Sequence, residues 1–141
     1  MSNNSNNQSS VSNHGVQVTG SMTAAPTVQV PKGTQSSTLV IKDIQVGTGA
    51  VVQPTSTLTV HYILYAGSSG KLVESSWTSG SPATFALTQV IPGWQEGMLG
   101  MKVGGRRLLI IPPDKGYGAN GAGPIGKNET LVFVVDLVSL A

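Results

Sequence analysis

The sequence predicts an α+β domain in which a curved antiparallel β-sheet is half-wrapped around one short α-helix. Three observations support this fold class. Eighteen glycines and eight prolines in 141 residues indicate many turns. Short apolar segments between these turns have the length and alternation of β-strands, and a single segment has a helical pattern. Elements in this proportion bury their apolar faces by packing the helix on one side of the sheet.

The predicted strands follow one another along residues 38–141, and turn residues bound each of them. In the second strand, alternation places Leu58, Val60, Tyr62 and Leu64 on one face. In the last and longest strand, it places Leu131, Phe133, Val135 and Leu137 on one face. The strands are expected at residues 38–47, 57–65, 71–76, 83–87, 106–112 and 130–140.

The helix is expected at residues 92–101, "PGWQEGMLGM". Pro92 stands at a first-turn position that tolerates proline, and Met98 and Leu99 would face the sheet. The internal glycines lower helix propensity, so the helix must be short and held by packing.

The first 37 residues differ in character from the rest. They are rich in Ser, Asn, Thr, Gln and Gly, with Pro26 and Pro31. Such a composition buries too little apolar surface to offset the entropy of ordering, so we expect residues 1–37 to be a disordered, low-complexity tail preceding a domain at 38–141. The alternative is a binding arm, against which the scarcity of aromatic and charged residues argues.

Composition excludes several classes of function. The chain has no cysteine, and its two histidines, His14 and His61, lack the spacing of metal ligands, so no metal site is expected. The net charge is +2 and no basic stripe is present, which argues against nucleic-acid binding. No segment reaches the ~20 apolar residues of a membrane span, and residues 1–15 do not resemble a secretory signal, so a cytoplasmic protein is expected.

Two short motifs have a functional interpretation that the surrounding sequence does not support. "GYGANG" (116–121) has the glycine spacing of a dinucleotide-binding turn, but the Gly and Pro that follow it prevent the helix which that site needs. His61 alternates out of phase with its apolar neighbours, which favours a strand residue over a catalytic base. The serines have no histidine–carboxylate context for hydrolase chemistry.

Five of the seven aromatic residues occupy distinctive places: Tyr62, Phe85, Trp94, Tyr117 and Phe133. An aromatic core would explain Phe85 and Phe133. It explains Tyr117 poorly, because a tyrosine between two glycines of a loop needs a polar partner or a ligand. The aromatic residues therefore indicate either a core or an apolar binding pocket.

Several motifs in one order closely resemble the FKBP-type peptidyl-prolyl cis-trans isomerases. They are "VIPGW" (90–94), "GMKVGGRR" (100–107), "IPPDKGYG" (111–118) and "TLVFVVDL" (130–137). "TLTVHY" and the hairpin "GKLVESS" are similar to that family's preceding elements, so the resemblance covers residues 38–141. It implies the fold described above and an enzyme that rotates X-Pro peptide bonds during protein folding.

The resemblance also implies a site. Its catalytic residues would be Tyr62, Glu74, Trp94, Tyr117 and Phe133, and its substrate-binding residues Val73, Phe85, Val90, Ile91 and Ile125. Trp94 would form the floor of a proline pocket. The backbone N–H of Ile91 and the hydroxyl of Tyr117 would hold substrate or inhibitor carbonyls.

Three departures from the family pattern bear on that site. Val73-Glu74 replaces the usual Phe-Asp, Ala83 replaces an aromatic residue, and residues 77–81 supply no basic partner for the acidic position. We therefore expect a pocket that is wider and less aromatic on one side.

The implied partners are proline-containing polypeptides and macrolide inhibitors such as rapamycin, with no cofactor, no nucleic acid and no membrane, and the chain is expected to be a monomer. Isomerisation breaks no covalent bond, so a pocket without a nucleophile or a metal suffices. Two alternatives stay open: a proline-binding or chaperone module with little turnover that uses the same pocket, and a structural β domain.

Overall fold

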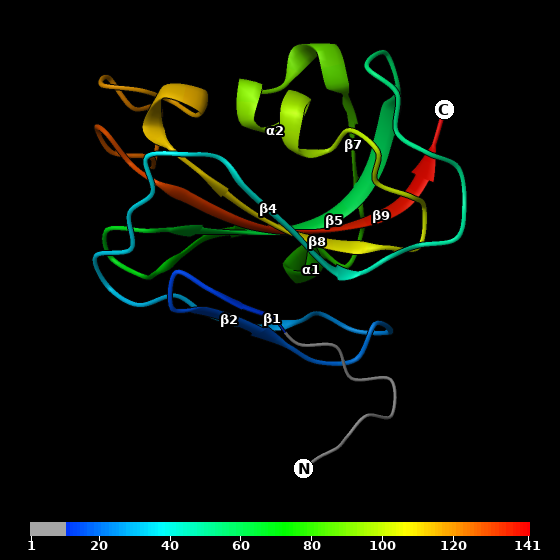
Figure 1. Ribbon diagram of the computed structural model, residues 1–141, viewed down its shortest axis with the longest axis horizontal. Helices are drawn as coiled ribbons and strands as arrows, with labels where there is room; N and C mark the ends of the chain where they lie inside the picture. The colour runs from blue at the N-terminus through cyan, green and yellow to red at the C-terminus, as the bar shows by residue number, and fades with distance from the viewer. Residues whose placement is uncertain (1–10) are drawn as a thin grey trace.

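The computed structural model describes residues 11–141 as two stacked β-sheets, with a short helix on the far side of the larger sheet (Figure 1). The larger sheet has six antiparallel strands in the order β4-β8-β9-β5-β6, and β7 also pairs with β5. Its strands are β4 (Val40–Gln45), β5 (Thr57–Ala66), β6 (Leu72–Ser75), β7 (Ala83–Ala86), β8 (Arg106–Ile111) and β9 (Leu131–Leu140).

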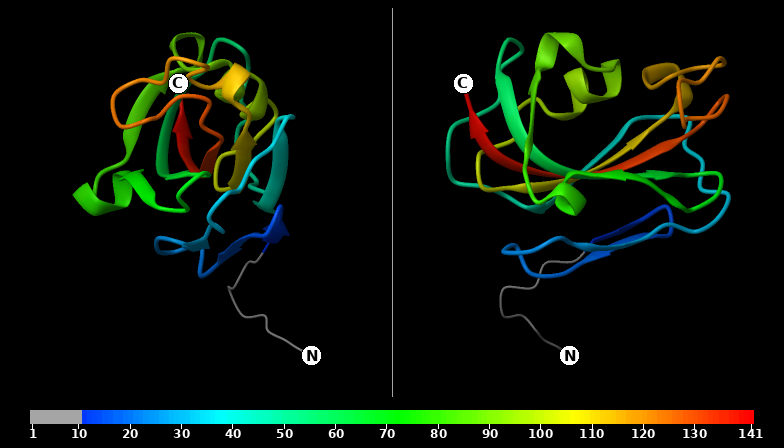
Figure 2. Two further views of the ribbon diagram at one scale, coloured as in Figure 1. Left: turned by 90° about the vertical axis from the view of Figure 1, so that its left-hand side faces the viewer. Right: turned by 180° about the vertical axis from the view of Figure 1, so that it is seen from behind.

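The predicted fold class is confirmed: the larger sheet curves around helix α2 (Pro92–Gly97) and is not closed into a barrel (Figure 2). Each of its strands lies within one residue of the predicted segment or inside it. One short 3-10 helix, Leu87–Gln89, lies between β7 and α2. A second, Pro113–Lys115, follows β8. Helix α1 (Ser76–Ser79) was not predicted, although Ser75 caps its first turn and Gly80 ends it in a left-handed conformation.

Helix α2 is shorter than the predicted segment. It ends at Gly97, and Gly100 has a φ of +79°. Arg107 Nη1 donates hydrogen bonds to the carbonyl oxygens of Gly97 (2.8 Å) and Leu99 (3.0 Å), which takes acceptors that a further helical turn would use. Met98 is fully buried against the sheet as expected, whereas Leu99 is 42% exposed, so its predicted contact with the sheet was wrong.

The two glycines inside α2 let the helix lie directly on the sheet. A Cβ atom on Gly93 would stand 2.5 Å from the Ile111 side chain, and one on Gly97 would stand 2.8 Å from Leu109. Tertiary packing of this kind outweighs the low helix propensity of glycine. The close approach sets the helix against β8 and brings Trp94 over the concave face.

The expectation of disorder does not hold for residues 11–37. This segment forms a second antiparallel sheet of β1 (Val11–Asn13), β2 (Val16–Thr19) and β3 (Thr27–Gln29), which covers the convex face of the larger sheet (Figures 1 and 2). His14 and Gly15 both have positive φ between paired Asn13 and Val16, as in a type I′ hairpin. Residues 1–10 of the predicted tail lie outside the described residues, and the domain boundary at residue 38 stays a prediction.

Burial of apolar side chains explains why this segment is ordered. Val16, Val18 and Val28 are at most 9% exposed. They pack on the apolar residues that the larger sheet presents on its convex side: Ile63, Leu108, Ile110, Val132 and Val134. Both β8 and β9 are therefore buried on two faces, which is typical of strands with continuous rather than alternating apolar residues.

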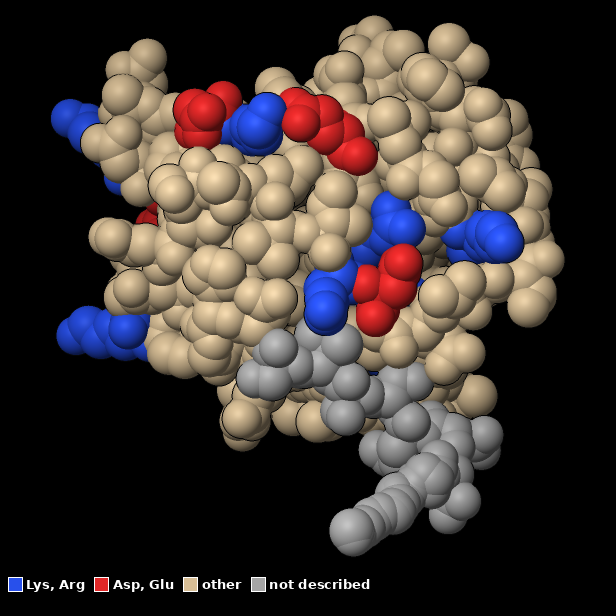
Figure 3. Space-filling view, viewed as in Figure 1, with Lys and Arg blue, Asp and Glu red and all other residues tan. Residues whose placement is uncertain are grey.

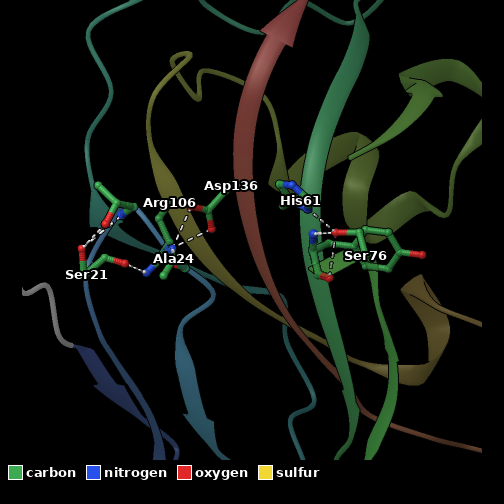
Figure 4. A network of polar contacts seen from close by, with 8 residues as sticks. Ser21, Ala24, His61, Ser76, Arg106 and Asp136 are labelled. Carbon is green, nitrogen blue, oxygen red and sulfur yellow. Dashed lines mark hydrogen bonds and ion pairs between the residues drawn. The ribbon is translucent and has the colours of Figure 1, made fainter. Parts of the chain in front are cut away.

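Hydrogen bonds add to the apolar contact between the two sheets. Arg106 is fully buried and is paired with Asp136, and its remaining donors reach the carbonyl oxygens of Ser21 (3.2 Å) and Ala24 (2.8 Å) (Figure 4). Further along, the backbone N–H groups of Gly33 and Thr34 donate to the turn between β5 and β6. The N-terminal sheet thus satisfies polar groups of the larger sheet as well as covering it.

Candidate active site

A cavity of about 410 Å³ opens between the concave face of the larger sheet and helix α2. The strands contribute side chains from the face that alternation predicted for β5 and β9, and α2 and the loop after β8 contribute the opposite wall. The lining residues are Tyr62, Leu64, Glu74, Phe85, Gln89, Val90, Ile91, Trp94, Tyr117 and Phe133.

The floor of the cavity is a cluster of four aromatic residues, in which three rings surround Trp94. The ring centroid of Trp94 lies 5.3 Å from that of Phe133 and 5.6 Å from that of Phe85, with interplanar angles of 82° and 72°. Tyr62 meets Trp94 edge-on at 6.1 Å and 85°. Such edge-to-face contacts fix ring orientations. Trp94 is 4% exposed, so the indole is a core residue as well as a wall of the cavity.

Tyr62 is the polar member of this cluster. Its hydroxyl donates a short hydrogen bond to Glu74 Oε2, and Glu74 stands near the end of β6. Burial, and then the hydrogen bond to Glu74, raise the pKa of the Tyr62 phenol well above its usual range. Tyr62 is therefore a neutral donor with a fixed ring at any physiological pH.

The raised pKa of Tyr62 has a consequence for stability in alkaline solution. Above pH ~10, a tyrosine ionises in the unfolded chain, whereas Tyr62 stays neutral in the folded protein, so its contribution to the free energy of unfolding falls as the pH rises. We expect the wild type to lose more stability between pH 9 and pH 11 than Tyr62→Phe does. Urea unfolding at several pH values measures the difference, and parallel curves for the two proteins would contradict it.

Tyr117 stands at the rim of the cavity in the loop after β8. It is 39% exposed, and its hydroxyl makes no hydrogen bond to another of residues 11–141. The loop is held near the helix by an exposed ion pair between Lys115 Nζ and Glu96 Oε2 at 2.8 Å. Figure 3 shows small groups of mixed acidic and basic side chains on this side of the molecule, with further basic side chains standing apart.

The backbone at the start of α2 also presents a donor. Ile91 is the N-cap residue of the helix, and its carbonyl accepts from Trp94 and Gln95. Within residues 11–141, its own N–H makes no hydrogen bond. The neighbouring carbonyl of Val90 accepts from Gln95 Nε2 at 2.9 Å, which fixes the approach to the helix.

The structure brings together eight of the ten residues implied by the family resemblance, and it leaves two outside the cavity. Val73 is half-buried against the concave core, and Ile125 is buried beneath the loop after β8, where its backbone pairs with Ala122. Leu64 and Gln89 line the cavity although sequence reasoning did not place them in the site. Leu64 was already on the predicted inner face of β5, so alternation was the signal; Gln89 is distinguished only by preceding Val90.

The structure also bears on two motifs that have another functional interpretation. No helix begins at residues 116–121, which contain turns and a left-handed Gly118, so the dinucleotide-binding interpretation fails. His61 lies outside the cavity lining and stacks on Trp77 with centroids 3.9 Å apart. Among residues 11–141, no cluster of three or more His, Asp or Glu side chains could hold a metal. In the same residues, no helix has the length and hydropathy to cross a membrane.

Comparison with known proteins agrees with this fold and cavity. The family model "FKBP-type peptidyl-prolyl cis-trans isomerase" matches residues 49–138. A probable FK506-binding protein of Corynebacterium glutamicum is 46% identical over 81% of this chain and 97% of its own length. An FK506-binding protein of Streptomyces anulatus is 49% identical over 82% of this chain and 96% of its own length. The crystal structure of FkpA from Escherichia coli superposes with a TM-score of 0.69 at 39% identity, over 78% of this chain and 52% of that one.

A curved antiparallel sheet, a helix that crosses it and a cavity lined by aromatic rings between them are the features of one class of prolyl isomerase. The chain belongs to the FKBP-type peptidyl-prolyl cis-trans isomerases, and its activity is the cis-trans isomerisation of peptidyl-prolyl bonds. Members of this family bind proline-containing substrates and FK506-like ligands. The alternative of a proline-binding module with little turnover is not favoured, because relatives are named as isomerases.

Proposed function

We propose that the prolyl ring of a substrate sits over Trp94, between Phe85, Tyr62 and Phe133, and that this cavity alone accelerates the rotation. The observation that carries the proposal is the ring-lined cavity of about 410 Å³ with the indole at its base. Its lining includes no serine, cysteine or histidine that could act as a nucleophile.

Rotation about an X-Pro bond needs none of these groups. The barrier of about 18–20 kcal/mol arises from the partial double bond of the planar amide. In the twisted state this resonance is lost and the amide is less polar, so an apolar cavity favours the twisted state over the planar one. Each ~1.4 kcal/mol of such preference is worth a factor of ten in rate. About 5 kcal/mol would therefore accelerate rotation several thousandfold.

Two donors at the cavity orient the substrate in this proposal. The N–H of Ile91 donates to one substrate carbonyl, and the hydroxyl of Tyr117 at the rim donates to another. Tyr62 has a different role, because its hydroxyl is already donated to Glu74. It acts as a fixed wall against which the prolyl ring packs.

The proposed role of Tyr117 is tested by Tyr117→Phe. We expect kcat/KM on an X-Pro peptide to fall about fivefold, the effect of one neutral hydrogen bond, while the free energy of unfolding changes by less than about 0.5 kcal/mol because the residue is exposed. Tyr65→Phe is the matched control, since Tyr65 packs on the convex side. Unchanged kcat/KM in Tyr117→Phe would remove the hydroxyl from the mechanism.

The same cavity is proposed to bind FK506-like macrolides such as rapamycin. Two relatives carry FK506 binding in their names. The cavity of this chain offers a macrolide an indole floor and the N–H of Ile91 as a donor. Binding should change the fluorescence of Trp94, and a Trp77→Phe background removes the signal of the second indole. A saturating shift with rapamycin is expected, and no shift together with undiminished isomerase activity would show that the cavity excludes macrolides.

The chain is proposed to act as a monomer on proline-containing polypeptides. Both faces of the larger sheet are already covered within one chain, by α2 on one side and by the N-terminal sheet on the other. Sedimentation at micromolar concentration is expected to give the mass of a single chain, and a stable dimer would contradict this.

A further inference from the structure

The pairing along the edge of β5 opposite β9 is interrupted at His61 and Tyr62. Along this edge, β7 pairs with residues 57–60 and β6 pairs with residues 63–65. Between these two strands the chain leaves the sheet to form α1. At Tyr62 no strand therefore supplies the hydrogen bonds that a ladder would give to the backbone of β5 on this side.

The side chain of Ser76 takes the place of the missing strand. Its Oγ accepts a hydrogen bond from the Tyr62 N–H at 2.7 Å and stands 3.3 Å from the Tyr62 carbonyl oxygen, to which it can donate. The same Oγ lies 2.9 Å from His61 Nδ1 (Figure 4). Ser76 is 8% exposed, so these bonds are shielded from water.

The contact between Ser76 and Tyr62 is connected to the cavity on its inner side and is buttressed on its outer side. Tyr62 lines the cavity, and its hydroxyl is held by Glu74 on β6, two residues before Ser76 at the start of α1. The backbone and the hydroxyl of Tyr62 are thus both fixed by the segment from β6 to α1. On the outer side, His61 is itself held in place by its stack on Trp77.

We propose that Ser76 is a positioning residue for the isomerase: it holds the backbone of β5 at Tyr62 so that the tyrosine ring forms the wall against which the prolyl ring packs. The inference rests on the proposed role of Tyr62 as that wall. Ser76 does not line the cavity and does not touch the substrate. Loss of its hydroxyl lets the Tyr62 backbone shift and weakens the Tyr62–Glu74 hydrogen bond.

Three variants in the full chain test this inference. Ser76→Ala removes the acceptor, Ser76→Thr keeps it, and Ser79→Ala is the matched control, because Ser79 Oγ bonds within α1 to the Ser76 carbonyl. We expect kcat/KM on an X-Pro peptide to fall about fivefold in Ser76→Ala, a loss on the scale of one hydrogen bond, mainly through a higher KM. Ser76→Thr and Ser79→Ala should stay within about twofold of the wild type, since the first keeps the hydroxyl and the second does not touch Tyr62.

A second readout follows Tyr62 itself. The absorbance of tyrosinate during an alkaline titration should show one phenol that resists ionisation in the wild type, and that phenol should ionise at lower pH in Ser76→Ala. A role confined to stability would leave both the KM and this titration unchanged. If Ser76→Ala does not fold, Ser76→Cys is used, because a thiol is a weak acceptor in nearly the same volume.

The outcomes separate this inference from the proposed function. Wild-type kcat/KM and a wild-type titration in a folded Ser76→Ala or Ser76→Cys variant would overturn the positioning role. Absence of isomerisation by the wild type would instead overturn the proposed function of the cavity.

Discussion

Removing residues 1–37 should lower the free energy of unfolding by about 4 kcal/mol, a large part of the 5–15 kcal/mol that stabilises an ordinary domain. The truncation exposes the convex face of the larger sheet, where Leu108, Ile110 and Val132 are fully buried in the intact chain. Each such side chain contributes about 1.5–3 kcal/mol when buried, and the conformational freedom regained by the released segment offsets part of the loss.

Polar contacts are lost in the same truncation. Arg106 loses the carbonyl oxygens of Ser21 and Ala24, although its ion pair with Asp136 remains. The exposed apolar strip should also bind a hydrophobic dye and promote aggregation. An unfolding midpoint and dye binding equal to those of the full chain would contradict this expectation.

Point substitutions on β2 test the packing of the N-terminal sheet on the larger sheet without shortening the chain. Val18 is fully buried against the larger sheet, whereas Gln17 faces solvent on the same strand. Val18→Asp should destabilise the protein by about 3 kcal/mol or more because it buries an unpaired carboxylate, and Gln17→Asp should change stability by less than about 0.5 kcal/mol. Equal effects of the two substitutions would show that the N-terminal sheet is not held by its valines.

Replacing Trp94 by leucine should affect both activity and stability. The indole is 4% exposed and contacts Phe133, Phe85 and Tyr62, so leucine leaves a void among the three rings. We expect the free energy of unfolding to fall by about 2–3 kcal/mol, less than for a substitution by alanine. We expect kcat/KM on an X-Pro peptide to fall about tenfold, because the floor of the cavity no longer fits the prolyl ring.

The second tryptophan provides the control for Trp94→Leu. Trp77 stacks on His61 at the convex side and is absent from the cavity lining. Trp77→Phe keeps a ring in that stack, so it should retain kcat/KM within about twofold despite some loss of stability. Full activity in a folded Trp94→Leu protein would show that the indole serves only the core.

The concave half of the fold could be predicted from alternation. Leu58, Val60 and Tyr62 on β5 fall on the buried face, as expected. The convex half was missed, because averaging composition over 37 residues hid the valines of β2 and β3. The larger sheet itself indicated that something covers its convex face, because Val132 and Val134 alternate with the predicted inner residues of β9 and would otherwise be exposed. Both are as buried as the inner residues.

The site was predictable where family motifs are continuous and less so in the loop after β8. Except for Val73 on β6, the implied residues at the start of α2 and on the strands line the cavity. Ile125 does not, because its loop is shaped by local contacts: Gly121 and Gly123 have positive φ, and Ile125 pairs with Ala122 and turns into the core. Helix α1 is only four residues long, too short to leave a periodic pattern, so the role of Ser76 beside Tyr62 could not be read from the sequence.

The most direct test of catalysis by the cavity alone is the rate of cis-to-trans exchange of an X-Pro peptide with the full chain, measured from pH 7 to pH 9. The added rate should rise in proportion to protein concentration and stay constant across this range, because Tyr62 remains neutral and no acid–base group takes part. Absence of any added rate, or a rate that rises or falls tenfold with pH while the protein stays folded, would contradict the mechanism.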